Sequence, residues 1–134
     1  MKSLCSLLLV DDNSFSRYAS QLVIKKLGLA QEVMEATNGQ EALDLLLTNL
    51  QSGKAYPDMI LLDWQMPIMD GEAFLEALQL TQNWTLLERV VIISSLFSPS
   101  QMQLIHSLGG KWILTRPLTE DSLRKILDKW PVAV

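Results

Sequence analysis

Three aspartates at the ends of two apolar runs are the residues of this sequence best suited to chemistry. Asp11 and Asp12 directly follow the run 4–10, and Asp63 directly follows the run 59–62. Carboxylates that lie close together raise each other's pKa values, and a divalent cation relieves their repulsion. Because oxygen ligands without a histidine or thiol favour a hard cation, the pattern indicates Mg²⁺ in preference to Zn²⁺.

A hydroxyl and a basic side chain follow two other apolar runs. Ser94 closes the run 90–94, and Arg116 follows the run 112–115. A carboxylate beside a bound cation can attack a phosphoryl group and form an acyl phosphate, a reaction that depends mainly on positioning and charge neutralisation. Ser94 could donate a hydrogen bond to the phosphoryl oxygens, and Arg116 could supply a fixed positive charge.

Each of these residues also has an ordinary structural interpretation. Asp11 and Asp12 alone are typical of a pair that caps a helix. Ser94 alone is typical of a strand-end hydroxyl, and Arg116 of a surface charge whose aliphatic stem packs on the sheet. The aspartate pair favours a metal site only when it is joined to Asp63.

Short apolar runs alternate with stretches of helical periodicity along the whole chain. At least three runs are apolar throughout, which is typical of strands buried on both faces of a parallel sheet. The expected strands are 4–10, 32–36, 59–62, 90–94 and 112–115, each followed by a helix. This alternation predicts a doubly wound α/β fold of three layers, with a five-stranded parallel sheet between two layers of helices. Such sheets carry their chemistry at the carboxyl ends of the strands, where the residues above would meet.

Apolar residues recur three to four positions apart in the first expected helix and predict a face that packs on the sheet. These residues are Phe15, Ala19, Leu22, Val23 and Leu27. Gly28 can end this helix.

Length and composition suit one domain that spans residues 1–134. The chain is 49% hydrophobic, which is enough to form a core. A net charge of −4 without a long basic run argues against nucleic-acid binding by this chain alone. No apolar stretch approaches the roughly 18 residues of a membrane span, so we expect no membrane insertion. Cys5, expected to be buried and inert in the first strand, is the single cysteine and agrees with a reducing, cytoplasmic location.

Two segments of the sequence resemble a response-regulator receiver domain of the chemotaxis CheY type. They are Leu-Leu-Leu-Val-Asp-Asp at 7–12 and Leu-Leu-Asp-Trp-Gln-Met-Pro-Ile-Met-Asp-Gly at 61–71, with Ser94 and Arg116-Pro117 in register. The resemblance extends from about residue 4 to residue 128. It implies the flavodoxin-like strand order 2-1-3-4-5.

The resemblance also implies roles for the acidic residues. Asp63 would accept a phosphoryl group from the phosphohistidine of a histidine kinase. Asp12 and Asp63 would bind Mg²⁺ directly, together with the backbone carbonyl of Gln65. Asp11 would act mostly through a metal-bound water.

Further roles concern the switch and the loops. Ser94 would be the switch hydroxyl that moves toward the phosphate. Pro67 and Gly71 would shape the loop after the third strand, and the Arg116-Pro117 peptide bond would be cis.

Two positions depart from the pattern of the family. Arg116 stands where the family usually has lysine, and a planar guanidinium is not equivalent to a compact ammonium. It could fill the cleft differently or pair with Asp63 before phosphorylation. Ile113 stands where an aromatic residue usually follows the switch hydroxyl, and Trp112 should point to the opposite face of the strand. Both departures concern switching, so phosphorylation is expected more securely than the usual conformational response.

The partner surface is expected near the fourth and fifth strands. Phe97 is either a partner contact or a core residue, and Trp112 lies toward the surface that the family uses for partners. Trp130 is expected to pack the last helix against the rest of the domain.

A phosphorylation-dependent signalling protein is the leading hypothesis. Its expected partners are a sensor histidine kinase or phosphotransfer protein and an unidentified downstream protein. Because the chain ends about where the fold is complete, we expect a stand-alone receiver, although excision from a larger hybrid kinase stays open. We expect no enzymatic activity beyond self-catalysed phosphoryl transfer and slow autodephosphorylation.

Two other functions compete with this hypothesis. A phosphohydrolase of the haloacid-dehalogenase type would need a carboxylic acid at Gln65 and a cap domain, and the sequence offers neither. The alternative that stays open is a receiver-like interaction module that works without phosphorylation, with Arg116 imitating the activated charge.

Overall fold

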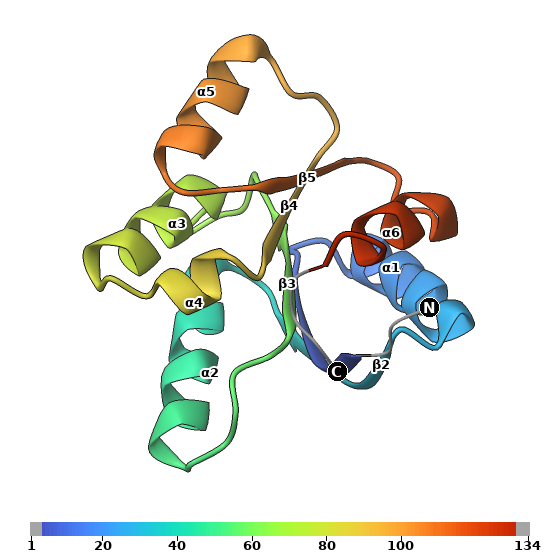
Figure 1. The fold of residues 1–134 in the computed structure, drawn as a ribbon, viewed down its shortest axis with the longest axis horizontal. Helices are drawn as coiled ribbons and strands as arrows, with labels where there is room; N and C mark the ends of the chain where they lie inside the picture. The colour runs from blue at the N-terminus through green and yellow to red at the C-terminus, as the bar shows by residue number, and fades with distance from the viewer. Residues whose placement is uncertain (1–3, 131–134) are drawn as a thin grey trace.

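The computed structural model describes residues 4–130 and shows a five-stranded parallel sheet in the order β2-β1-β3-β4-β5 (Figure 1). This order and the parallel pairing confirm the expected fold. The strands are β1 (Leu4–Val10), β2 (Ala30–Ala36), β3 (Met59–Asp63), β4 (Val90–Ser94) and β5 (Trp112–Thr115). β2 begins at Ala30 rather than at Glu32, and β3 includes Asp63 as its last residue.

Helices cover both faces of the sheet, as expected for three layers. They are α1 (Ser14–Leu27), α2 (Gly39–Gln51), α3 (Gly71–Leu80), α4 (Trp84–Leu87), α5 (Pro99–Ser107) and α6 (Glu120–Leu127). Within the described residues there is thus one helix more than the five expected. The additional helix, α4, is a single turn that Asn83 caps by accepting a hydrogen bond from the Leu86 amide.

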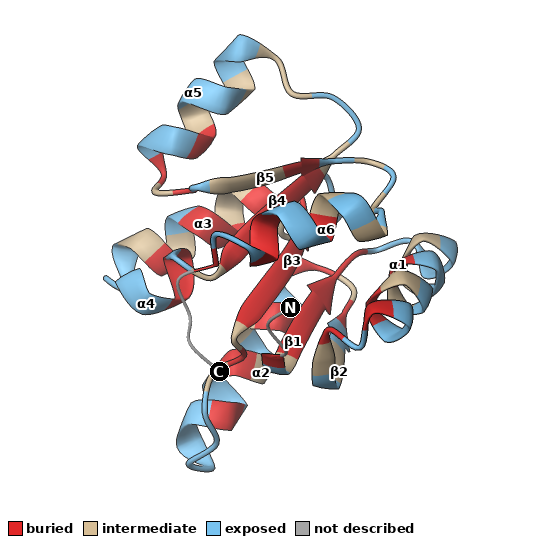
Figure 2. Ribbon diagram, turned by 45° about the vertical axis from the view of Figure 1, so that its right-hand side comes forward, coloured by how far each residue is buried: buried red, intermediate tan, exposed pale blue. Residues whose placement is uncertain are grey.

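Two apolar cores explain why the strands are apolar throughout. Leu8 and Val10 of β1 pack with α2, α3, α4 and α5 on one face, whereas Leu7 and Leu9 pack with α1 and α6 on the other. Successive side chains of a strand point to opposite faces, so a strand covered on both sides needs apolar residues at every position. The buried strands lie between outward-facing, exposed helix surfaces (Figure 2).

The last strand shows the same alternation. Ile113 packs against the core of α2 to α5, and Trp112 packs against the opposite core, as predicted. There the ring of Trp112 lies 5.3 Å from the ring of Trp130, centroid to centroid. Trp130 is 1% exposed, which confirms its expected packing role at the end of α6.

The expected core face of α1 is wrong for three of its residues, because Phe15, Ala19 and Leu22 are exposed. Phe15 is 85% exposed and Leu22 is 52% exposed, whereas Ile24 and Leu27 are buried. Each residue of a helix turns by about 100°, so Phe15 and Leu22 lie on nearly the opposite side of α1 from Ile24. Packing of Ile24 and Leu27 against the sheet therefore directs Phe15 and Leu22 outward.

Cys5 also differs from its expectation, since it is exposed. It lies near the amino-terminal end of β1, where it lines a groove with Glu32 and Lys54 rather than the core. Among the described residues, no helix has the length and apolarity that crossing a membrane requires.

Candidate functional site

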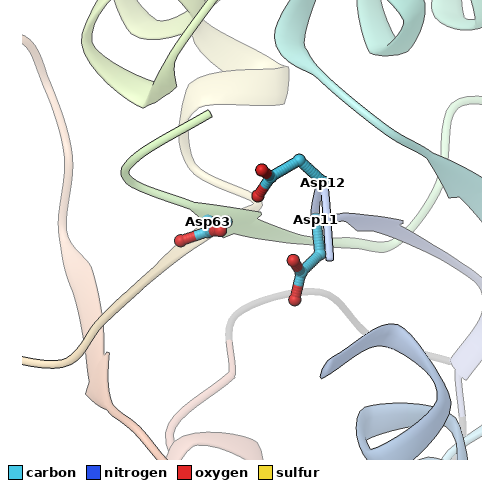
Figure 3. Close-up of side chains that lie close together, drawn as sticks. All are labelled: Asp11, Asp12 and Asp63. Atoms are coloured by element: carbon cyan, nitrogen blue, oxygen red, sulfur yellow. The ribbon is translucent and has the colours of Figure 1, made fainter. Parts of the chain in front are cut away.

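The three aspartates of the sequence prediction meet at the carboxyl edge of the sheet. Oxygen atoms of Asp11, Asp12 and Asp63 all lie within 4.8 Å of one another (Figure 3). The pairing of β1 with β3 places Val10 opposite Leu62, so the residues that follow them are neighbours. The side chains of Asp11 and Asp63 are only 4% and 11% exposed, whereas Asp12 is exposed.

Hydrogen bonds from the following loop hold Asp11 in place. The backbone N–H of Asn13 donates to Oδ1 of Asp11 at 2.9 Å. Asn13 is also the N-cap of α1, because its side chain accepts a hydrogen bond from the Ser16 amide at 2.9 Å. The start of α1 and the orientation of Asp11 are therefore set by one short turn.

The loop after β3 is held by a close approach that requires glycine. The N–H of Gly71 donates to the carbonyl of Trp64 at 3.0 Å. A Cβ atom at Gly71 would lie 2.7 Å from Cε3 of Trp64, which is closer than carbon atoms approach without a clash. Pro67 lies in the same loop, where its carbonyl accepts a hydrogen bond from Met69 at 2.7 Å. Gly71 thus brings α3 against the residue that follows Asp63.

Arg116 reaches the aspartates from the fifth strand. Its Nη2 atom lies 3.1 Å from Oδ1 of Asp63 and 3.3 Å from Oδ2 of Asp11, and its Nη1 atom lies 2.6 Å from Oγ of Ser16. The side chain is 27% exposed. The guanidinium therefore bridges two carboxylates inside the cleft, and the interpretation of Arg116 as a charge on the open surface is wrong. The peptide bond to Pro117 is cis.

Burial dominates the electrostatics of Asp63. Burial raises the pKa of the Asp63 carboxyl above its ordinary value, and the negative charge of Asp11 adds to this effect. The hydrogen bond and the charge of Arg116, together with the backbone N–H of Gln65, oppose the shift without cancelling it. Asp63 is therefore a carboxylate whose charge the fold only partly compensates.

A cleft of about 640 Å³ opens over these groups. Ser94 lies in its lining, and the Ser94 hydroxyl donates a hydrogen bond to the carbonyl of Leu96 at 3.1 Å. The lining residues are Asp11, Asn13, Ser16, Asp63, Gln65, Ser94, Ser95, Leu96, Ser98, Gln101 and Arg116. The loops after β1, β3, β4 and β5 all contribute, so the structure brings the expected carboxylate, hydroxyl and basic groups into one cleft.

Sequence reasoning missed Ser16 and Asn13. Asn13 carries a recognisable signal, because an asparagine before a helical stretch is a favoured N-cap. Ser16 carries none, because its importance depends on the direction in which Arg116 extends, 100 residues further along the chain.

The two expected partner residues are both half-buried. Phe97 packs against the core of α2 to α5, and Trp112 packs against Trp130. Two apolar side chains near the cleft are more exposed, Phe15 at 85% and Leu96 at 76%. A partner surface at Phe97 and Trp112 stays a prediction.

A doubly wound parallel sheet with clustered aspartates, a hydroxyl and a basic residue at its carboxyl edge defines the receiver class of signalling domains. The sequence model of the family described as "Response regulator receiver domain" matches residues 7–128. The chain therefore belongs to this family, a family of two-component signalling domains.

Individual relatives agree with this assignment. The chain is 28% identical to a two-component response regulator of rice, Oryza sativa subsp. japonica, over 132 residues that make up 98% of each protein. It is 30% identical to the sensor histidine kinase CheAY of Helicobacter pylori over 91% of this chain but only 14% of that protein. The solved structure of the Vibrio cholerae chemotaxis protein CheY4 is similar with a TM-score of 0.75 and 25% identity, covering 96% of this chain and 99% of that one.

The residues present fit the Mg²⁺ that acidic clusters of receiver domains bind. All of the clustered donors are carboxylate oxygens, which a hard cation prefers. Three carboxylates face one bridging guanidinium, which leaves a formal excess of two negative charges when all are ionised. A divalent cation would balance this excess and favour the ionised form of Asp63.

Proposed function

We propose that this receiver domain accepts a phosphoryl group on Asp63 from a phosphohistidine, with Mg²⁺ bound, and passes the signal on through altered protein contacts. The observation that carries the proposal is the place of Asp63 in the cleft. It is a largely buried carboxylate, with Asp11, Asp12 and Arg116 around it and with raised pKa. A carboxylate in such surroundings can attack a phosphoryl group and form an acyl phosphate, whose added negative charge a cation and Arg116 would offset.

In the proposed transfer, an oxygen of Asp63 attacks the phosphorus atom of the phosphohistidine. The P–N bond breaks as the O–P bond forms, and the imidazole nitrogen keeps the electron pair and takes up a proton. Asp12, Asp63 and the backbone carbonyl of Gln65 would hold the cation, with Asp11 acting through a water. The bound ion would neutralise charge on the phosphoryl oxygens.

Ser94 and Arg116 are proposed to respond to the new phosphoryl group. The Ser94 hydroxyl donates to Leu96 in this structure, so it must turn away from that carbonyl to donate to a phosphoryl oxygen. Arg116 must release at least part of its contact with Oδ1 of Asp63, since that carboxylate would carry the phosphoryl group and bind the cation. Movement of these two residues would couple phosphorylation to the loop after β4.

The proposed phosphodonor is a protein that covers the cleft. Phe15 lies on α1 between the cleft residues Asn13 and Ser16, and Leu96 lies in the cleft lining itself. Both side chains are largely exposed. Tyr18, which is 67% exposed, lies one turn after Phe15, and these two side chains form an exposed apolar strip on α1. A helical donor domain of a histidine kinase or phosphotransfer protein could pack on this strip and present its phosphohistidine to Asp63.

Intact mass spectrometry after incubation with Mg²⁺ and acetyl phosphate or phosphoramidate tests the acceptor. The wild type should gain one phosphoryl group, and Asp63→Asn should gain none. Asp44→Asn is the matched control, because Asp44 is an exposed carboxylate on α2 and should leave the gain unchanged. Omission of Mg²⁺ with a chelator present should suppress the reaction.

No gain in the wild type, with Mg²⁺ binding shown separately, would contradict phosphoryl acceptance. A module that docks without phosphorylation would then explain the chain better. Partner binding unchanged by Asp63→Asn and by Arg116→Lys would give that conclusion independent support.

A further inference from the structure

We infer that Ser16 is a positioning residue that holds Arg116 across Asp11 and Asp63 and so makes the arginine a built-in competitor of the divalent cation. The inference rests on the proposed function, because it concerns the cation at the same carboxylates. Its basis is the short contact between Nη1 of Arg116 and Oγ of Ser16, at 2.6 Å. Nη2 of the same guanidinium meets both carboxylates at 3.1 and 3.3 Å.

Both ends of this contact are fixed by secondary structure. The Ser16 amide is bonded to the N-cap residue Asn13, which places the serine hydroxyl in the first turn of α1. The Arg116 amide donates to the carbonyl of Ser94 at 2.9 Å, which places the start of the arginine side chain beside the end of β4. The side chain therefore spans the cleft from the sheet to α1, with one anchored atom on each side.

The planar guanidinium couples the contacts of its two terminal nitrogen atoms. Nη1 and Nη2 belong to one rigid fork, so Nη2 cannot leave the carboxylates without moving Nη1 relative to Ser16. Ser16 therefore stabilises the bridging orientation through its hydrogen bond to Arg116. A lysine at this position has a single terminal nitrogen, so it could not use one nitrogen for the carboxylates and a second for Ser16.

Arg116 and the divalent cation would interact with the same carboxylates. Arg116 contacts Asp11 and Asp63, two of the three clustered aspartates, so cation binding must weaken these contacts. Arg17 is not a substitute, because it donates to the backbone carbonyl of Asp11 at 2.7 Å and pairs with Glu35 at 3.9 Å. Loss of the Ser16 hydroxyl should therefore weaken the contacts of Arg116 with the carboxylates and strengthen binding of the cation.

Titration of the purified chain with Mg²⁺ by isothermal calorimetry tests this inference. Ser16→Ala removes a hydrogen bond that a charged donor makes to a hydroxyl. From the usual strength of such a bond, we expect the Kd for Mg²⁺ to be about three- to tenfold lower in Ser16→Ala than in the wild type. Ser16→Thr keeps the hydroxyl and should restore the affinity of the wild type. Ser14→Ala, the same kind of change at an exposed position of the same helical turn, should leave the Kd unchanged.

A double-mutant cycle separates positioning from a general effect on α1. Arg116→Met removes the guanidinium and should itself tighten Mg²⁺ binding. Ser16→Ala added to Arg116→Met should then have no further effect, because the group that Ser16 anchors is absent. The melting temperatures of all variants are measured alongside, so that a change in Kd can be separated from a change in folding.

Each outcome has one meaning. Tighter binding in Ser16→Ala that disappears in the Arg116→Met background supports the inference. An unchanged or weaker affinity in Ser16→Ala, or the same gain in both backgrounds, would overturn it and leave the proposed function standing. Failure of the wild type and every variant to bind Mg²⁺ would overturn the inference together with the metal-dependent function.

Discussion

At the scale of single residues, the character of this site comes from charges that the fold leaves partly uncompensated. Asp63 is largely buried beside Asp11, and Arg116 offsets only part of the resulting penalty. A carboxylate in this state costs the folded protein stability for as long as it is ionised. The proposed acceptor therefore lowers the stability of the folded protein while it is ionised.

Asp63→Asn should consequently keep or raise the melting temperature at neutral pH. The folded pKa of Asp63 is raised, so its ionisation destabilises the native state above that pKa. This destabilisation disappears when the pH is below the ordinary pKa of an aspartate in the unfolded chain, about 3.9. The advantage of Asp63→Asn over the wild type should therefore be larger at pH 7 than at pH 4, as measured by thermal unfolding without Mg²⁺. A large loss of stability in the variant at pH 7 would argue against a strained acidic cleft.

Trp64 should report the binding of Mg²⁺. Its side chain is 7% exposed, and it directly follows Asp63. A change of charge at Asp63 should alter its fluorescence because the indole lies in the adjoining, water-poor environment. Trp64→Phe should remove the response, and a response that survived would have to come from one of the other tryptophans.

At the scale of elements, the loop between β3 and α3 depends on how closely α3 approaches the strand. The path of this loop, through Pro67 and Ile68, ends where Gly71 meets Trp64. Ile68 has a φ of 68°, a strained value for a β-branched residue. The loop that carries the proposed metal ligand Gln65 is therefore held by tight packing rather than by relaxed geometry.

Gly71→Ala should lower the free energy of unfolding by about 1–3 kcal/mol, the usual effect of overpacking. The new Cβ would lie 2.7 Å from the Trp64 ring and 3.0 Å from its Cα atom, so the loop must shift. We expect slower phosphoryl acceptance at Asp63 as well. Urea unfolding measures the first effect and the rate of mass gain measures the second.

Gly53→Ala provides the comparison. Gly53 has a φ of 79° but no atom within 4 Å of the new Cβ, so this variant has only the backbone effect. It should lose stability without a change in the rate of phosphorylation. Equal phosphorylation rates in both variants would mean that the approach of Gly71 does not position Asp63.

At the scale of the whole molecule, the helices cover the two faces of the sheet and leave the cleft open at its carboxyl edge. α1 and α6 cover one face of the sheet, and α2 to α5 cover the other (Figure 1). The cleft opens at the carboxyl edge of the sheet, among the loops that follow β1, β3, β4 and β5. The phosphodonor that we propose would therefore reach Asp63 from the carboxyl edge. The exposed apolar strip of α1 borders this approach.

Phe15→Ala should slow phosphoryl transfer from a phosphorylated histidine-containing protein by about tenfold, which is the effect of losing one central aromatic contact. Phosphorylation by acetyl phosphate and the melting temperature should not change, because Phe15 is 85% exposed. Leu47→Ala, at an exposed position of α2, is the control. Equal slowing with both donors would place Phe15 in the chemistry of the site rather than in docking.

The sequence by itself determined the sheet and the gathering of the aspartates. Apolar runs with a helix after each specify buried parallel strands, and residues that end neighbouring parallel strands must meet at one edge. Asp11, Asp12, Asp63, Ser94 and Arg116 came together for this reason. These features depend on the periodicity of apolar residues and on the order of the elements, both of which can be recognised in short segments of the sequence.

Only the tertiary structure decided how the side chains are oriented within that frame. The rotation of α1 depends on which of its faces fits the sheet, so Phe15 and Leu22 lie outward although their spacing suits a core. The exposure of Cys5 and the extra turn α4 likewise became apparent only in the three-dimensional structure. The contact of Arg116 with Ser16 joins residues 100 positions apart, and its geometry depends on the distance between β5 and α1, which no local pattern encodes.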